Sequence, residues 1–156
     1  MIISHRGNLA GPNPEKENHP DYIAVSLNDG FHVEIDAWII KNKVYLGHDA
    51  PVYEATDYFR YHGAWYQYNG NFVDSPALWI HCKNFSALNE GSSFFYGHYF
   101  THNQDDFTLT STGYIWTYPR NLPLSKISIA VMPERVPEWN VSLAAGVCTD
   151  FPIKYK

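Results

Sequence analysis

Short β-prone runs recur along the whole chain, and their spacing limits the folds that it can adopt. The first run, 1–4, is separated from the second, 31–38, by a loop and a helical pattern over 19–30. A strand, a helix and a second strand in this order are typical of a parallel sheet. Further short strands are predicted over 77–83, 93–97, 107–110, 114–118, 126–132 and 145–150. The pattern therefore predicts an α/β fold.

The length of 156 residues narrows the choice of architecture. A full barrel of alternating strands and helices usually needs about 250 residues. Helices are predicted over 19–30, with Asn18 as the cap, and over 84–91, and a hairpin is predicted over 38–47. We therefore predict a single domain over 1–156, built as a trimmed (β/α)8 TIM-like barrel in which loops replace several helices. An open α/β sheet is the alternative.

The composition limits the partners and the compartment. The formal net charge is -5, which argues against a general nucleic-acid or anionic-membrane binder because such proteins present a basic surface. A small anionic substrate is still compatible with this charge, since a metal or a few local cations can hold a phosphate. No apolar run approaches the length of a transmembrane helix, and no signal-peptide pattern is visible. We expect a cytoplasmic protein without membrane insertion.

Two carboxylates stand on one side of the second predicted strand. Alternation in "VEIDAW" places Glu34 and Asp36 on one face, and Val33 and Ile35 on the other. Oxygen ligands of this kind are what Mg²⁺ and Ca²⁺ prefer, so the pair could form half of a cation site. The alternative is an exposed strand face with two solvated acids.

Other polar residues follow the ends of predicted strands. His5 could act as a general acid or base, and the fork of donors on Arg6 could bind a phosphate. His48 taken alone is an ordinary turn histidine that Asp49 could orient. In "WIHCKN", His81 and Lys83 share one strand face. Lys83 could supply positive charge, whereas His81 could bind a metal, donate a proton or fill space. Each residue taken alone also fits an ordinary loop or core position.

The order of these motifs resembles the glycerophosphodiester phosphodiesterase family, which belongs with the phosphatidylinositol-specific phospholipase C-like barrels. The family pattern runs HRG, PENT, E-x-D, HD, E-x-K and a closing G-(I/V)-x-TD-x-P. The matching segments are HRG (5–7), KENH (16–19), EID (34–36), GHD (47–49), HCK (81–83) and GVCTDFP (146–152). The resemblance therefore spans the chain from end to end, with a shortened middle.

The resemblance implies metal-dependent hydrolysis of a small phosphodiester, with a glycerophosphodiester as the default substrate. A divalent cation, Mg²⁺ or Ca²⁺, is the implied cofactor. One acidic ligand of the family is replaced by His81, a softer ligand that makes Mn²⁺ or Zn²⁺ alternatives. The implied roles are acid and base for His5 and His48, metal ligation for Glu17, Glu34, Asp36 and His81, and substrate binding for Arg6, Lys83, Asn18 and Trp116.

Several alternatives stay open at this point. The substrate could be another diester, or the chain could bind a phosphorylated ligand without turning it over. An interaction domain is a third reading, suggested by the Tyr and Trp content. His102, Asp105 and Asp106 form either a second polar cluster or a turn with Asp side chains capping backbone amides. Cys82 is predicted on the strand face opposite His81, and Cys148 in the core.

Overall fold

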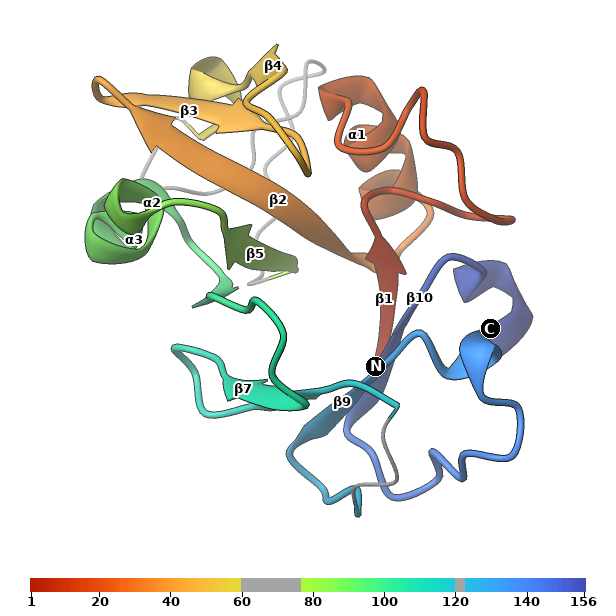
Figure 1. Ribbon diagram of the computed structural model, residues 1–156. Coiled ribbons are helices and arrows are strands. Elements are labelled where there is room, and N and C mark those ends of the chain that lie inside the picture. Colours follow the sequence, from red (N-terminus) through yellow and green to blue (C-terminus); the bar gives the residue numbers. More distant parts are fainter. Residues whose placement is uncertain (60–76, 120–122) are drawn as a thin grey trace.

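The protein is described by a computed structural model over residues 1–59, 77–119 and 123–156 (Figure 1). Its centre is a run of parallel strands in the spatial order β6, β5, β2, β1, β10, β9, β8. The carboxyl ends of all these strands therefore lie along the same edge of the sheet. Their bounds are β1 Ile2–His5, β2 His32–Ile40, β5 Leu78–Cys82, β6 His98–Phe100, β8 Ile115–Thr117, β9 Ser128–Val131 and β10 Gly146–Thr149.

Three short strands join this run through antiparallel pairings. β3 (Lys43–Leu46) folds back on the second half of β2, and β4 (Tyr53–Glu54) pairs with β3. β7 (Phe107–Leu109) pairs with β8. The β2–β3 turn is the hairpin that the sequence predicts, with Lys41 and Asn42 both at positive φ. The predicted strand over 93–97 is wrong, because residues 91–94 form a helical turn instead.

The predicted (β/α)8 TIM-like barrel is wrong. The described part of the chain forms a curled, mostly-sheet half-barrel of ten strands with three short α-helices (Figure 1). Later connections between parallel strands hold other structure in place of α-helices: the antiparallel strand β7 lies between β6 and β8, and a 3₁₀ helix over 133–135 lies between β9 and β10. The helices are α1 Pro20–Asn28, α2 Phe85–Asn89 and α3 Gly91–Phe94, and the 3₁₀ helices are η1 Thr56–Phe59, η2 Pro133–Arg135 and η3 Pro152–Tyr155.

The helix α1 begins at Pro20, one residue later than predicted. His19, rather than Asn18, is the N-cap, and its Nδ1 accepts a hydrogen bond of 3.2 Å from the Asp21 amide. Asn18 instead adopts a left-handed conformation with φ 62° and points back toward the sheet. This conformation suits Asn better than most residues, since its short polar side chain tolerates positive φ.

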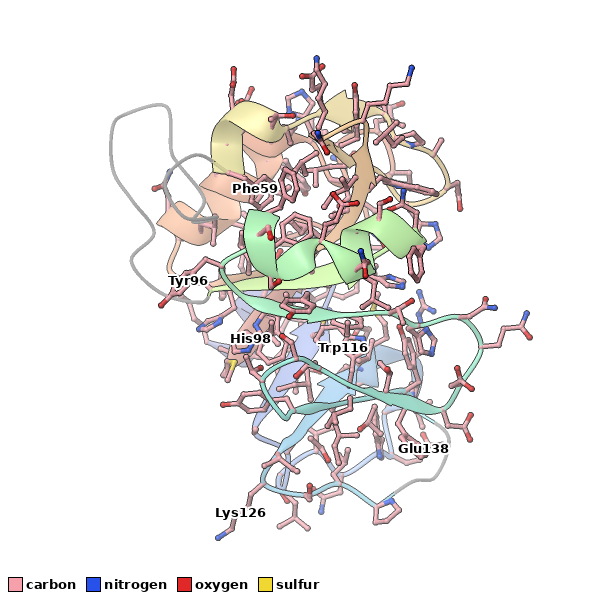
Figure 2. The ribbon with its side chains drawn as sticks, turned by 90° about the vertical axis from the view of Figure 1, so that its left-hand side faces the viewer. Phe59, Tyr96, His98, Trp116, Lys126 and Glu138 are labelled. Atoms are coloured by element: carbon pink, nitrogen blue, oxygen red, sulfur yellow. The ribbon has the colours of Figure 1, made fainter. Side chains whose placement is uncertain are left out.

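The two faces of the curled sheet carry separate apolar cores. Helices α1 and α2 cover the outer face, where Ile23 and Ala87 belong to the same cluster as Val33 and Ile35. The inner face holds Trp79, Trp116 and other large residues. Phe59 belongs to the outer core and Trp116 to the inner one (Figure 2). In the described ranges, no helix is both long and apolar enough to cross a membrane.

Candidate active site at the carboxyl ends of the parallel strands

Alternation along neighbouring strands brings the predicted site residues onto the inner face of the sheet. In the strand register His5 of β1 is opposite Glu34 of β2, and Asp36 of β2 is opposite His81 of β5. Lys83 follows β5 by one residue and points the same way as His81, since its Nζ reaches to 3.6 Å from Asp36 Oδ1.

Tight turns deliver the polar residues that follow the strands. After β1, Arg6 and Gly7 both have positive φ, 52° and 87°, and a Cβ at Gly7 would lie 3.0 Å from Tyr22. Gly47 has φ 144°, and a Cβ there would lie 2.2 Å from the Ala50 carbonyl oxygen. The positive φ and the close neighbours at these two positions, next to Arg6 and His48, therefore favour glycine over residues with a Cβ atom.

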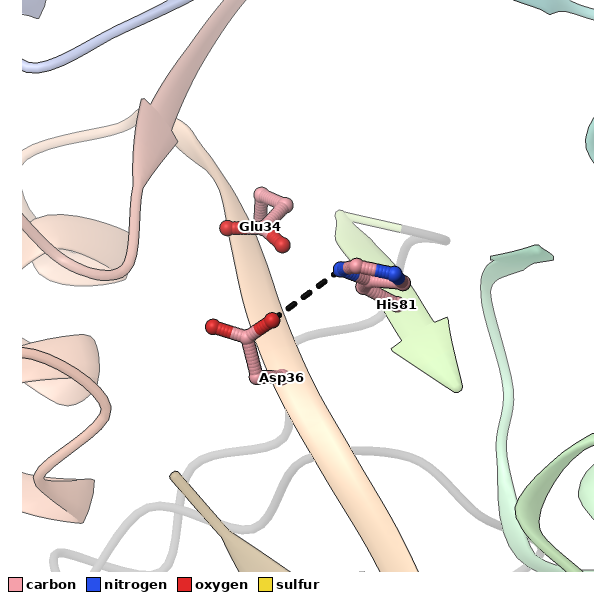
Figure 3. A group of neighbouring side chains, drawn as sticks. All are labelled: Glu34, Asp36 and His81. Atoms are coloured by element: carbon pink, nitrogen blue, oxygen red, sulfur yellow. Dashed lines mark ion pairs between the residues drawn. The ribbon is translucent and has the colours of Figure 1, made fainter. Parts of the chain in front are cut away.

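Glu34, Asp36 and His81 form a group whose potential ligand atoms all lie within 4.8 Å of one another (Figure 3). His81 Nδ1 lies 3.0 Å from Asp36 Oδ1, and this ion pair is the dashed line in Figure 3. All three residues are buried, with Asp36 fully so. Two carboxylates and one imidazole directed at a common point are a donor set that fits a divalent cation.

The hydrogen bonds of His81 leave one ring nitrogen directed at this point. Its Nε2 donates to the His102 carbonyl oxygen at 3.0 Å, so the neutral ring carries its lone pair on Nδ1. That lone pair faces an oxygen of Asp36, and two acceptors so close require a proton or a metal ion between them. Histidines that bind metals commonly donate their other N–H to a carbonyl in this way.

Asp36 lies close to several cationic or potentially cationic side chains of the site, namely Arg6, His81 and Lys83. Arg6 Nε lies 2.8 Å from Oδ2, and Asn18 both donates to Oδ2 at 2.9 Å and accepts from the Asp36 amide at 2.9 Å. Burial by itself would raise the pKa of Asp36, but the contact with His81 and the charge of Arg6 hold it well below its ordinary range. Asp36 is therefore ionised at neutral pH.

In contrast to Asp36, Glu34 has surroundings that disfavour its ionised form. It is 3% exposed, and its Oε2 accepts no hydrogen bond from the described residues. His5 Nε2 is an ion-pair partner of this oxygen at a long 3.8 Å. Burial and the neighbouring charge of Asp36 raise the pKa of Glu34 well above its ordinary value, although the charge of Arg6 partly offsets this. An unsatisfied buried carboxylate oxygen beside Asp36 is the second observation that fits a cation.

His5 is oriented by a residue from the other end of the chain. Its Nδ1 donates to Asp150 Oδ1 at 2.7 Å, which leaves Nε2 directed toward Glu34 and the cavity. Asn8 Nδ2 donates to the same Asp150 oxygen at 2.8 Å. Burial alone would raise the pKa of Asp150, but the hydrogen bond and charge of His5 lower it overall. A buried carboxylate of this kind selects one imidazole tautomer.

Glu17 lies outside the candidate metal group, and it contacts Arg6, which lines the cavity over that group. Glu17 accepts from Arg6 NH1 at 3.0 Å and from Asn8 Nδ2 at 3.0 Å, and it is not part of the group around Glu34. Arg6 has Asp36 on one side and Glu17 on the other. Both residues thus belong to a partly buried ion-pair network that connects the loop after β1 to β2.

A cavity of about 520 Å³ opens over the group. His5, Glu34, His81 and Lys83 line it, and so does His48, whose side chain is 44% exposed and whose Nδ1 contacts Asp49 Oδ1 at 2.7 Å. The structure therefore brings both histidines of the predicted acid–base pair to one cavity. Trp116 also lines this cavity but is 2% exposed and packs on Phe100, so most of its surface belongs to the core.

Sequence reasoning missed several residues of this cavity and its support. Asp150 and Asn8 orient His5, and Tyr118 and Arg135 line the wall. A signal for Asp150 exists, because it follows the last strand in the closing TDFP segment at the same sheet edge as His5. His102 stacks on Tyr118, and its Nε2 donates to the Asp105 carbonyl, which makes this segment a turn beside the site.

No family model, curated protein or solved structure matches the chain.

Proposed function

We propose that this protein is a metal-dependent hydrolase of small phosphodiesters. The observation that carries the proposal is the Glu34–Asp36–His81 group, in a cavity that also holds an aspartate-oriented histidine. Glu34, Asp36 and His81 Nδ1 would hold the divalent cation. When bound there, the cation would neutralise charge on a phosphate oxygen as a Lewis acid.

His5 and His48 are suited to the two proton transfers of such a reaction. One imidazole accepts the proton of the attacking water or hydroxyl as the new P–O bond forms. The other donates a proton to the leaving alkoxide as the second P–O bond breaks. Each ring has its Nδ1 on a carboxylate oxygen at 2.7 Å, Asp150 for His5 and Asp49 for His48. Each Nε2 is therefore the nitrogen that exchanges the proton.

The substrate class follows from the charge and the size of the cavity. Lys83 and Arg135 line it together with Glu34 and His81, so a single negative charge on the substrate would be compensated. A volume of about 520 Å³ accommodates a small organic diester. The motif resemblance makes a glycerophosphodiester the default candidate within this class.

One observation favours a second function, which is binding of a phosphorylated ligand without turnover. Asp36 is contacted by Arg6, His81 and Lys83, so its charge can be balanced by protein cations alone. In that case the group is a closed ion-pair network, and the cavity binds an anion through the remaining cations. Titration of Mg²⁺, Mn²⁺ and Zn²⁺ into the chelator-treated protein distinguishes the two functions. The binding function predicts no uptake by the wild-type protein.

The proposal is tested by hydrolysis of bis-(p-nitrophenyl) phosphate. We expect release of p-nitrophenol that stops with EDTA and returns when Mg²⁺, Ca²⁺, Mn²⁺ or Zn²⁺ is added in excess. The rate should fall to background in His5→Ala with each metal. If a folded sample releases nothing with any of the four metals, and nothing from glycerophosphodiesters, the hydrolase proposal is wrong.

A further inference from the structure

A second cavity shares lining residues with the cavity over the candidate metal group, and we call the two cavities the lobes of the site. This lobe, of about 500 Å³, lies along the loop after β1 and is lined by Pro14, Val52 and Tyr53 among others. The residues that line both lobes are His5, Arg6, His48 and Arg135. The proposed acid–base pair and two arginines therefore stand where the lobes meet.

A diester has one anionic centre and two organic arms that leave it in different directions. A phosphate at the junction of the lobes would let each arm enter one lobe. The junction must then supply a hydrogen-bond donor for the non-bridging phosphate oxygens. That donor must not already be paired with another group of the protein. The two arginines of the junction differ in this respect.

Arg6 is held between two carboxylates, by a hydrogen bond to Glu17 and an ion pair with Asp36. Its Nε lies 2.8 Å from Asp36 Oδ2, and its NH1 donates to Glu17 Oε2 at 3.0 Å. Withdrawing these donors would leave two charges with fewer partners inside the protein, which is strongly unfavourable. Arg6 therefore acts on the substrate through charge and through the position of Asp36, rather than by direct contact.

Arg135 has its guanidinium available. The side chain is exposed at the cavity wall, and the described residues make no ion pair or hydrogen bond with it. Its backbone is held in place, because the Arg135 amide donates to Met132 O at 3.0 Å in η2. The preceding residue, Glu134, accepts from the Asp150 amide at 2.9 Å, which ties η2 to the residue that orients His5.

From these contacts we propose that Arg135 is the arginine that binds the phosphate of the substrate, at the junction of the two lobes. This inference rests on the proposed function, because it concerns the substrate of the same site. The guanidinium contacts non-bridging oxygens through its planar fork of donors. The two ester arms then occupy separate lobes, so the site selects a diester with two organic arms.

The first test measures binding of inorganic phosphate, with Mg²⁺ present, by isothermal titration calorimetry. Loss of a charge-assisted contact predicts that Arg135→Gln binds phosphate roughly 10- to 100-fold more weakly than wild type. Arg135→Lys should recover part of the affinity, since it keeps the charge and loses the fork. Unfolding curves check that each variant is folded, which is expected because the side chain is exposed.

The matched control is Lys126→Gln, which removes one exposed positive charge outside the lining of both lobes (Figure 2). Lys126 precedes β9, whereas Arg135 follows its carboxyl end, so the two residues are at opposite ends of that strand. The control should bind phosphate as wild type does. Equal weakening by both variants would mean a general charge effect and would overturn the proposal, as would wild-type affinity in Arg135→Gln.

Activity separates this inference from the proposed function. If phosphate binding depends on Arg135 but no diester is hydrolysed, the hydrolase proposal fails and the assignment of Arg135 stands. If diesters are hydrolysed and Arg135→Gln leaves both KM and phosphate affinity unchanged, the hydrolase proposal stands and the assignment of Arg135 is wrong.

Discussion

The imidazole of His5 and the carboxylate of Asp150 lie 2.7 Å apart although they are 145 residues apart in the sequence. The contact joins the ends of β1 and β10, which are adjacent parallel strands. It leaves Nε2 of His5 directed toward Glu34 and the cavity, where we propose that it exchanges a proton. We therefore expect changes at this contact to affect both the activity and the stability of the protein.

Asp150→Asn should destabilise the protein by about 1–1.5 kcal/mol at pH 7, because a charge-assisted hydrogen bond becomes a neutral one. The folded pKa of Asp150 is lowered, so the folded state binds fewer protons than the unfolded state near that pKa. The contribution is complete above the unfolded pKa of about 3.9 and disappears as the pH falls through the folded value. Urea unfolding between pH 3 and 7 measures the difference between the free energies of unfolding of wild type and variant. This difference should become smaller below about pH 4. A difference that stays constant over this range would contradict the assignment.

His5→Ala and His48→Ala should each lower kcat by about 10²–10⁴-fold, which is the usual contribution of a general acid or base. Steady-state hydrolysis of a chromogenic diester is the measurement. His19→Asn is the control, since it removes a histidine outside the main cavity and keeps an N-cap acceptor for α1. Full activity in His5→Ala would show that the acid–base assignment is wrong.

Glu34→Gln should change the free energy of unfolding in opposite directions with and without metal. In EDTA the variant should be more stable than wild type by about 1–3 kcal/mol, because a buried carboxylate with an unsatisfied oxygen becomes neutral. With saturating Mn²⁺ or Zn²⁺ the order should reverse, since wild type gains stability from binding. Thermal unfolding at pH 7.5 in both conditions tests this. A metal-induced shift of the same size in both proteins would exclude Glu34 as a ligand.

His81→Glu should move the metal preference toward hard cations. Three carboxylates favour Mg²⁺ and Ca²⁺, whereas one imidazole among two carboxylates also suits Zn²⁺ and Mn²⁺. Competition titrations should therefore show tighter Mg²⁺ or Ca²⁺ binding in the variant and weaker Zn²⁺ binding. Identical affinities in the two proteins would place the metal away from His81.

Both cysteines should be unreactive in the native protein. Cys82 and Cys148 are 2% and 0% exposed, and burial raises the pKa of each thiol, that of Cys82 to about 12. Little thiolate is then present at pH 8, and the reagent has no access to it. Titration with a chromogenic disulfide should give no reaction before unfolding and both thiols after it. Rapid native labelling would contradict the packing of β5 and β10.

Much of the candidate site follows from local pattern. Alternation on β2 is a property of any strand, so the shared face of Glu34 and Asp36 could be predicted without knowing the neighbouring strands. The same reasoning placed His81 and Lys83 together and Cys82 on the opposite face, where it joins the outer core. The positions of Gly7 and Gly47 likewise reflect local backbone geometry.

The tertiary structure determines the contacts between distant residues, which the local sequence pattern does not specify. Three features depend on which strands are adjacent and on how the sheet curls. They are the contact between His5 and Asp150, the hydrogen bond from Arg6 to Glu17 and the position of Arg135 at both cavities. Periodicity in the sequence gives the faces of a strand, whereas its neighbours are set by burial and by long-range pairing. For the same reason the sequence predicted parallel strands correctly and the trimmed (β/α)8 barrel wrongly, because β7 and the 3₁₀ helix η2 occupy later connections between parallel strands.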